Sequence, residues 1–197
     1  MLDISAVAGS PPVPGRSCGS CTLCCKVFNV PEVESPAGKW CRHCAPGTGC
    51  TIHATRPDIC RRFFCGWMVS PALGPEWKPE RSKVILLLHA AGNGTFRLIA
   101  HVDESYPTAW RRADIYERLK RIATSGGPTA GGGLKVLVRV RIGRRHIVVL
   151  PDRDVDLGIL DDDEDIDVKV SGMIVEVEKV RRAGGDGAAG ATMGLPA

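Results

Sequence analysis

CGSCTLCC, residues 18–25, opens a series of nine cysteines that continues through CRHC (41–44), Cys50, Cys60 and Cys65. A C-x-x-C turn lets two thiolates converge on one metal ion, and thiolates are ligands that suit both zinc and iron–sulfur clusters. The run C-x-x-C-x-x-C also has the spacing by which bacterial-type ferredoxins place three thiolates around one [4Fe–4S] cluster. These residues therefore predict a metal site that holds zinc or iron.

Every cysteine is a candidate metal ligand, which gives the set Cys18, Cys21, Cys24, Cys25, Cys41, Cys44, Cys50, Cys60 and Cys65. Cys24 and Cys25 are neighbours, and neighbouring side chains diverge, so we expect them to serve two sites or to include one non-ligand. His43 and His53 are weaker candidates for a Cys3His site. His43 would point away if both flanking thiolates bind, whereas His53 is better placed, three residues after Cys50.

The rest of the chain indicates a soluble protein without a membrane partner. No apolar run approaches the roughly 18 residues that a membrane-spanning helix needs. Residues 1–15 lack the charged segment and apolar core of an export signal. We therefore expect a cytoplasmic protein with reduced thiols. This expectation, together with the odd number of cysteines, favours metal binding over a disulfide framework.

The cysteine pattern also resembles a known family. CGSCTLCC, followed by KWCRHC, GCTIHATRPDICRRFFCGW and PEWKPERSKV, is similar to the CxxCxxCC cysteine-cluster family of zinc- or iron-chelating proteins (YkgJ-type), mainly over residues 17–70. The resemblance implies metal binding but no particular reaction, and we assign no catalytic residue. A flagellin lysine N-methylase has related cysteine patterns, which implies an iron–sulfur alternative. The positions that match the family are Cys18, Cys21, Cys24, Cys25, Cys41, Cys50, Cys60 and Cys65.

Arg56 and Arg61 lie among the candidate ligands and are predicted to support the site. Four thiolates on one Zn²⁺ leave a net charge of −2, which nearby guanidinium groups would offset. Ordinary salt bridges at the surface are the alternative interpretation of both residues.

Composition and periodicity predict an α+β fold, in which a metal-stabilised cysteine module precedes a small, mainly antiparallel β unit with one helix. Strands are predicted over 83–89, 95–102, 134–142, 145–150, 168–170 and 173–180. The helix is expected to follow Pro107 and run to about Ala123, with Thr108 as its N-cap and a glycine-rich loop at 126–133. The predicted organisation is a flexible leader (1–16), the cysteine module (17–70), a connector (71–82), the α+β unit (83–180) and a disordered tail (181–197).

Charge is distributed unevenly. Residues 81–151 carry 13 Lys and Arg against 4 Asp and Glu, whereas residues 152–197 carry 5 against 12. In the strand 134–142, Lys135, Arg139 and Arg141 alternate with apolar residues, which predicts a half-buried sheet with a basic face in solvent. The run 161–167 is predicted to be a solvated acidic loop.

Three functions follow from these patterns. The first, which we prefer, is a zinc- or iron-binding protein whose metal site is structural or handles metal. The second is an iron–sulfur protein in methyl-transfer or electron-transfer chemistry. The third is a zinc-stabilised nucleic-acid-binding module, which the low aromatic content of 5% disfavours because few bases could stack. No protein partner is indicated, and enzymatic activity stays open.

Overall fold

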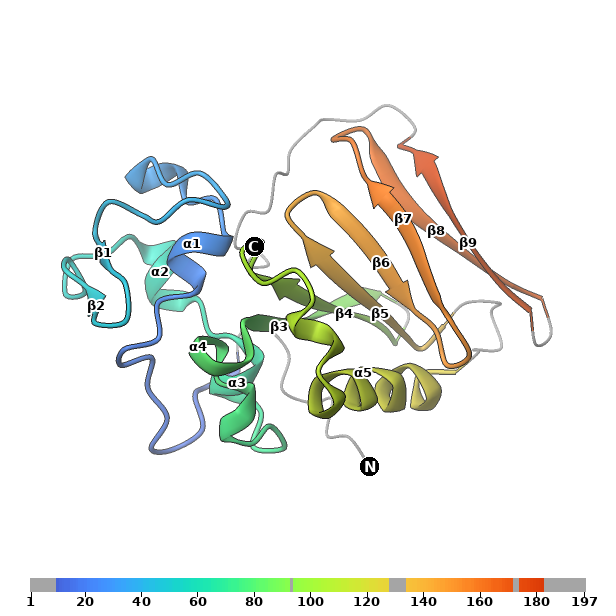
Figure 1. Ribbon diagram of the computed structural model, residues 1–197, viewed down its shortest axis with the longest axis horizontal. Coiled ribbons are helices and arrows are strands. Elements are labelled where there is room, and N and C mark those ends of the chain that lie inside the picture. The colour runs from blue at the N-terminus through green and yellow to red at the C-terminus, as the bar shows by residue number, and fades with distance from the viewer. Residues whose placement is uncertain (1–9, 93, 128–133, 172–173, 183–197) are drawn as a thin grey trace.

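The chain folds, as predicted, into a mixed α+β structure in which a five-stranded sheet carries one long helix on one face (Figure 1). This computed structural model describes residues 10–92, 94–127, 134–171 and 174–182. Parts of four predicted segments lie outside these ranges: 1–9 of the leader, 128–133 of the glycine-rich loop, 173 of the last predicted strand and 183–197 of the tail.

Short elements dominate the first third of the chain. The cysteine region, residues 17–70, contains α1 (Cys24–Val27), the 3-10 turn η1 (Pro31–Val33), β1 (Cys44–Ala45), β2 (Gly49–Cys50), α2 (Asp58–Arg62) and α3 (Gly66–Val69). The predicted connector contains a second 3-10 turn, η2 (Pro75–Trp77), and α4 (Pro79–Ser82). Proline occupies the first position of both, where its missing N–H costs no helical hydrogen bond.

The sheet has the order β3-β4-β5-β6-β7. Its strands are β3 (Val84–Gly92), β4 (Thr95–Val102), β5 (Val136–Ile142), β6 (Arg145–Val149) and β7 (Asp154–Ile159). The two predicted hairpins, β3–β4 and β5–β6, are antiparallel. β4 and β5 pair in parallel, and α5 (Ala113–Ser125) lies between them in sequence, since parallel neighbours need a crossover. β8 (Glu164–Ser171) and β9 (Ile174–Arg181) form a separate antiparallel ribbon.

Helix α5 packs on one face of the sheet. Ile115, Leu119 and Ile122 recur at helical spacing and are buried against strand residues that include Val138 and Val140. The helix begins later than expected, because the 3-10 turn η3 (Ala109–Arg111) first places the buried Trp110 in this core. Thr108 therefore takes the N-cap position of η3 rather than of α5, and neither element has a side-chain capping hydrogen bond. None of the helices in the described ranges is long and apolar enough to cross a membrane.

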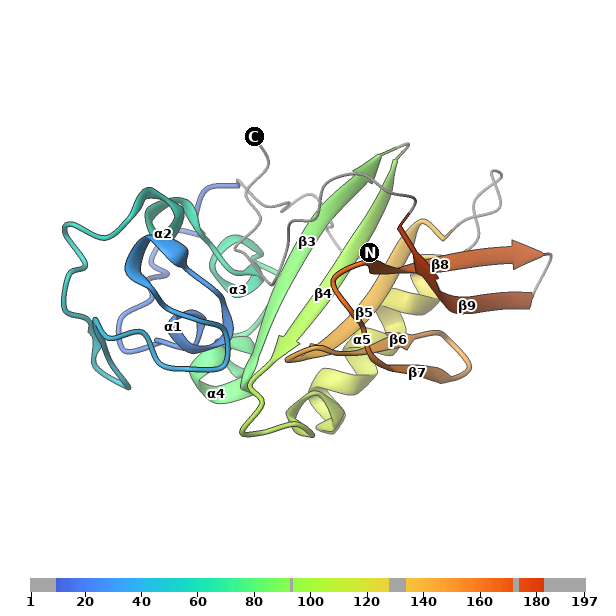
Figure 2. The same cartoon turned by 90° about the horizontal axis from the view of Figure 1, so that it is seen from above.

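The opposite face of the sheet is covered at both ends. Ile85 and Leu87 of β3 share a core with Phe28 of the cysteine region, so the cysteine region and the sheet are packed together. At the other end, Leu137 and Val148 pack against the β8–β9 ribbon. Figure 2 shows the cysteine region and the ribbon on the two sides of the molecule, with β3 and β4 between them.

The predicted basic face in solvent is wrong for the centre of β5. Arg139 is only 8% exposed and Arg141 is half-buried, whereas Lys135 is exposed. Alternation along the strand correctly places these side chains on one face, but that face is enclosed by the cysteine region and the ribbon.

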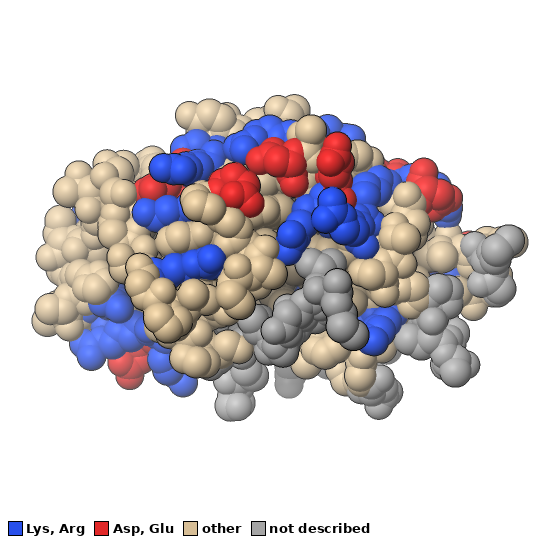
Figure 3. Space-filling model, turned by 90° about the horizontal axis from the view of Figure 1, so that it is seen from below, with Lys and Arg blue, Asp and Glu red and all other residues tan. Residues whose placement is uncertain are grey.

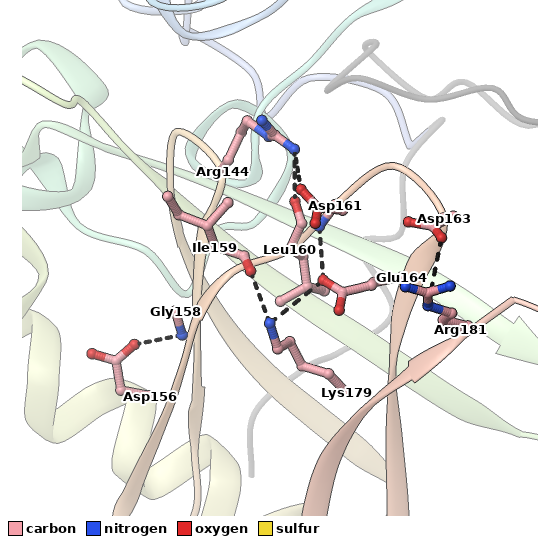
Figure 4. A network of polar contacts seen from close by, with 10 residues as sticks. All are labelled: Arg144, Asp156, Gly158, Ile159, Leu160, Asp161, Asp163, Glu164, Lys179 and Arg181. Carbon is pink, nitrogen blue, oxygen red and sulfur yellow. Dashed lines mark hydrogen bonds and ion pairs between the residues drawn. The ribbon is translucent and has the colours of Figure 1, made fainter.

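The predicted acidic loop is also shorter than expected, because β8 already begins at Glu164. Polar contacts hold the ribbon to the sheet (Figure 4). Lys179 donates to the carbonyl oxygen of Ile159 at 3.1 Å, and Arg144 pairs with Asp161 at 2.7 Å. Strand β7, which sequence periodicity did not identify, brings Ile159 to this junction.

The described part of the predicted leader lies against the cysteine region. The backbone N–H of Val13 donates to the carbonyl oxygen of Met68 at 2.8 Å. The guanidinium of Arg16 donates to the carbonyl oxygens of Ser70 and Leu73 at 2.8 and 2.7 Å. These contacts tie residues 10–16 to the turn that follows α3.

The end of α5 offers a test of this packing. Gly126 follows the helix as predicted, and a Cβ atom there would lie 2.6 Å from Cβ of Val136 and 3.0 Å from its backbone N and O. Replacing Gly126 by alanine is therefore expected to destabilise the protein by about 1–3 kcal/mol, the usual cost of overpacking. Urea unfolding measures this loss, and Gly127→Ala, which meets only an ordinary contact at 3.8 Å, serves as the control. Equal stability of the two variants would contradict the close approach.

Candidate metal centre

Eight of the nine cysteines line one cavity of about 120 Å³, which we call the cysteine cavity. They are Cys18, Cys21, Cys24, Cys25, Cys41, Cys50, Cys60 and Cys65. A cavity of about 10–15 Å³ by this measure already holds a water molecule, so the space exceeds what one metal ion needs. Three separate chain segments, residues 18–25, 41–50 and 60–65, thus present thiols to the same space.

Tight turns position these thiols. The N–H of Cys21 donates to the carbonyl oxygen of Cys18 at 2.8 Å, which closes the first C-x-x-C turn. Cys60 lies within α2, and Cys65 directly precedes α3. The N–H of Cys41 donates to the carbonyl oxygen of Cys25 at 2.8 Å and so ties the second group of cysteines to the first.

Cys24 and Cys25 line the same cavity, contrary to the divergence expected of neighbours. Both begin the helical turn α1, where successive side chains differ in direction by about 100° rather than the 180° of a strand. The two sulfurs are also joined by a hydrogen bond. Divergent side chains therefore do not require Cys24 and Cys25 to serve two separate metal sites.

Cys44 is the cysteine that does not line the cavity. It begins β1, directly opposite Cys50, and its thiol hydrogen-bonds to Cys25 and Thr22. Cys44 thus neighbours Cys25, which does line the cavity. Thr22, which lies inside the cysteine motif and which we did not single out from sequence, also accepts a hydrogen bond from the N–H of Gly47 at 3.3 Å.

The environment of the thiols is largely apolar, with Val30, Phe63 and Met68 in the wall. Burial raises the pKa of Cys60 to about 11 and that of Cys65 to about 12. Cys25 differs, because a hydrogen bond from the Cys24 thiol, helped by one from Cys44, lowers its pKa to about 7. Apart from Cys25, the thiols with perturbed pKa values are held in their protonated form when no cation is bound.

The two predicted supporting residues differ in their position relative to the cavity. Arg56 lines the cavity, and its positive charge lowers the pKa of Cys18, against the larger opposing effect of burial. Arg61 does not line it, and instead donates to the carbonyl oxygens of Arg56 and Ala54 at 2.8 and 3.0 Å. Arg61 therefore holds the loop that carries Arg56.

Both candidate histidines, His43 and His53, also line the cavity, so both stay candidate ligands. All nine cysteines are free thiols. Within the described ranges, however, no three Cys, His, Asp or Glu side chains already form a set of metal ligands. The thiols surround the cavity without meeting at one point, so metal binding requires them to turn inward and lose protons. Thiolate donors suit zinc or iron, but these side chains have to turn inward before they can bind either metal.

Comparisons of the chain with protein-family models, with characterised proteins and with solved structures give no match. The resemblance of the cysteine motif to the CxxCxxCC family therefore stays a prediction. The function has to be argued from the residues of the site.

Proposed function

We propose that this chain is a cytoplasmic zinc- or iron-binding protein whose metal is held by thiolates of the cysteine cavity. One observation carries the proposal: eight cysteines from three separate segments line the same small cavity. Isolated buried cysteines behave as small apolar residues and have no reason to gather in this way. Thiolates around a common space are the donor set that zinc and iron–sulfur clusters share.

The proposed role of the metal is structural or metal-handling. The longest helix of the cysteine region has five residues, and its two strands have two residues each. Regular hydrogen bonding therefore stabilises little of this region. A metal that links Cys21, Cys41 and Cys60 would join its three segments, as structural zinc does in small domains.

An iron–sulfur cluster is the alternative occupant, with methyl-transfer or electron-transfer chemistry as its role. Two features support it: the C-x-x-C-x-x-C spacing and a cavity larger than one ion needs. The residues that would hold a cluster are drawn from the same eight cysteines, and a bound cluster would supply electron transfer.

The nucleic-acid alternative is suggested by the basic middle of the chain, residues 81–151. Two of its basic residues, Arg139 and Arg141, are buried or half-buried, which leaves fewer of them for a polyanion. On the face seen in Figure 3, acidic and basic side chains of the described residues lie side by side rather than as a patch of one sign. On such a surface the basic side chains would attract a nucleic acid, and the neighbouring acidic side chains would repel it.

The test is elemental analysis with a visible spectrum on full-length protein purified without oxygen. Zinc at one or two equivalents in a colourless protein is expected for the structural site. Iron with acid-labile sulfide and a broad visible absorption would identify the cluster instead. Protein without stoichiometric zinc or iron, and unable to take up either after reduction, would overturn the proposal.

A further inference from the structure

A second cavity, of about 710 Å³, lies on the covered face of the sheet. We call it the arginine cavity. Its floor is formed by β3 to β6, and its walls come from residues 26–38 of the cysteine region and from residues 160–165 near the ribbon. Small-molecule sites typically measure about 300–1,000 Å³. None of its lining residues lines the cysteine cavity, so the two spaces are separate.

Strand register gathers polar side chains on its floor. His101 of β4 is paired with Arg141 of β5, and Arg141 is paired with His146 of β6. Arg139 lies two residues before Arg141 and therefore on the same face of the strand. Adjacent strands lie about 4.8 Å apart, so this row spans roughly 10 Å. Two guanidinium groups and two imidazoles thus border the same cavity, which is partly open to solvent.

The buried positive charge in this cavity is incompletely compensated. One Nη of Arg139 lies 2.8 Å from Nδ1 of His146, and the other lies 4.0 Å from Asp165. Its Nε is buried and has no hydrogen-bond partner among the described residues. Arg141 donates from Nε to the carbonyl oxygen of Gly143 at 2.8 Å. A buried guanidinium normally requires a close anionic partner, because its desolvation is costly.

Six carboxylates line the cavity, and two of them are engaged in short ion pairs. Asp103 pairs with Lys26 at 2.6 Å, and Asp161 pairs with Arg144 at 2.7 Å. Glu104 and Asp162 act on Arg141 only from a distance, and both are exposed at the rim. Glu164 pairs with Lys179 at 3.5 Å, and Asp165 approaches Arg139 only to 4.0 Å. Among the described residues, no carboxylate therefore makes a close ion pair with Arg139 or Arg141.

The histidines add donors without adding charge. Burial and the neighbouring Arg139 and Arg141 lower the pKa of His146 to about 3, and burial also lowers that of His101 well below its usual value. Nδ1 of a neutral His146 accepts from Arg139, which places its proton on Nε2. Both imidazoles are thus neutral at pH 7.

We propose that the arginine cavity binds the phosphate group of a small molecule, held between Arg139 and Arg141. A phosphate ester carries about −1.5 to −2 charges at pH 7 and three strong acceptor oxygens, which matches two guanidinium groups and neighbouring imidazole donors. Arg97 and Arg182, exposed at the rim, supply further positive charge. The volume leaves room for an organic group beyond the phosphate.

The test is isothermal calorimetry of the full-length protein with inorganic phosphate and with adenosine monophosphate. Sodium chloride at equal ionic strength is the reference, and succinate probes carboxylate binding. Arg141→Gln is expected to weaken phosphate binding on the order of 10- to 100-fold, since it removes charge-assisted hydrogen bonds. Arg121→Gln makes the same change of charge on the exposed side of α5 and is expected to leave binding unaltered.

Arg97→Gln guards against misfolding, because Arg97 is exposed at the rim. It is expected to weaken phosphate binding several-fold while unfolding as wild type. The proposal is overturned if phosphate binds no better than chloride, if succinate binds and phosphate does not, or if Arg141→Gln and Arg97→Gln bind like Arg121→Gln. The cavities share no lining residue, so metal content measured on each variant reports separately on the cysteine site.

Discussion

Replacing Cys21 or Cys60 by serine is expected to abolish most metal binding and to destabilise the protein by at least about 4 kcal/mol. Loss of a metal is one of the few mechanisms that reach such values, and structural zinc contributes on the order of 10 kcal/mol to small domains. The two residues come from different segments of the cysteine region, and both line the cysteine cavity. Metal content by elemental analysis and unfolding in guanidinium measure the two effects.

Cys44→Ser is the matched control. Cys44 belongs to the same sequence motif but does not line the cavity, so its variant is expected to keep its metal and most of its stability. Full metal content in both Cys21→Ser and Cys60→Ser, or loss of metal only in Cys44→Ser, would contradict the site.

Amide hydrogen exchange measures which elements lose protection in the Cys21→Ser and Cys60→Ser variants. Ile85 and Leu87 of β3 pack against the cysteine region, whereas Val138 and Val140 of β5 pack under α5. We expect the ligand variants to lose amide protection in the cysteine region and along β3, while the core beneath α5 stays protected. Independent unfolding of the cysteine region, with β3 unchanged, would contradict the shared core.

Acidification is expected to destabilise the protein below about pH 6.5 through His101 and His146. Both pKa values are lowered in the folded state, that of His146 to about 3, whereas an unfolded histidine titrates near 6.5. Between these values the unfolded chain binds more protons than the folded protein, so stability falls as pH falls. At pH 5 His146 accounts for a loss of about 2 kcal/mol, and His101 acts in the same direction.

Burial is the main cause of both lowered pKa values, and the charges around the imidazoles act in the same direction. Arg139 and Arg141 disfavour a proton on either ring, and Asp165 opposes them only weakly at His146. Urea unfolding between pH 7.5 and 5 measures the slope. Because acid also releases metal from thiolates, the informative comparison is with the double variant His101→Gln, His146→Gln. An equal slope in the double variant and the wild type would contradict the assignment to these histidines.

Some features could be predicted from the sequence because they depend on local patterns. The hairpins follow from alternation of apolar residues, and α5 follows from the helical spacing of Ile115, Leu119 and Ile122. The clustering of cysteines between positions 18 and 65 likewise keeps the thiols within a short stretch of chain. Strand β7 was not predicted, although Val155, Leu157 and Ile159 alternate with other residues. Aspartate and glycine are unfavourable in strands, and the ion-pair partners of Asp154 and Asp156, Lys120 and Arg145, lie elsewhere in the chain.

By itself, the sequence determined which residues share a face or a turn, because periods of 2 and 3.6 residues are properties of the local backbone. It did not determine what covers each face. Only the tertiary structure decided that Arg139 lines a cavity and that Cys44 does not line the cysteine cavity. These outcomes depend on how the cysteine region and the β8–β9 ribbon pack onto the sheet, and such contacts between distant segments leave no periodic signal in the chain.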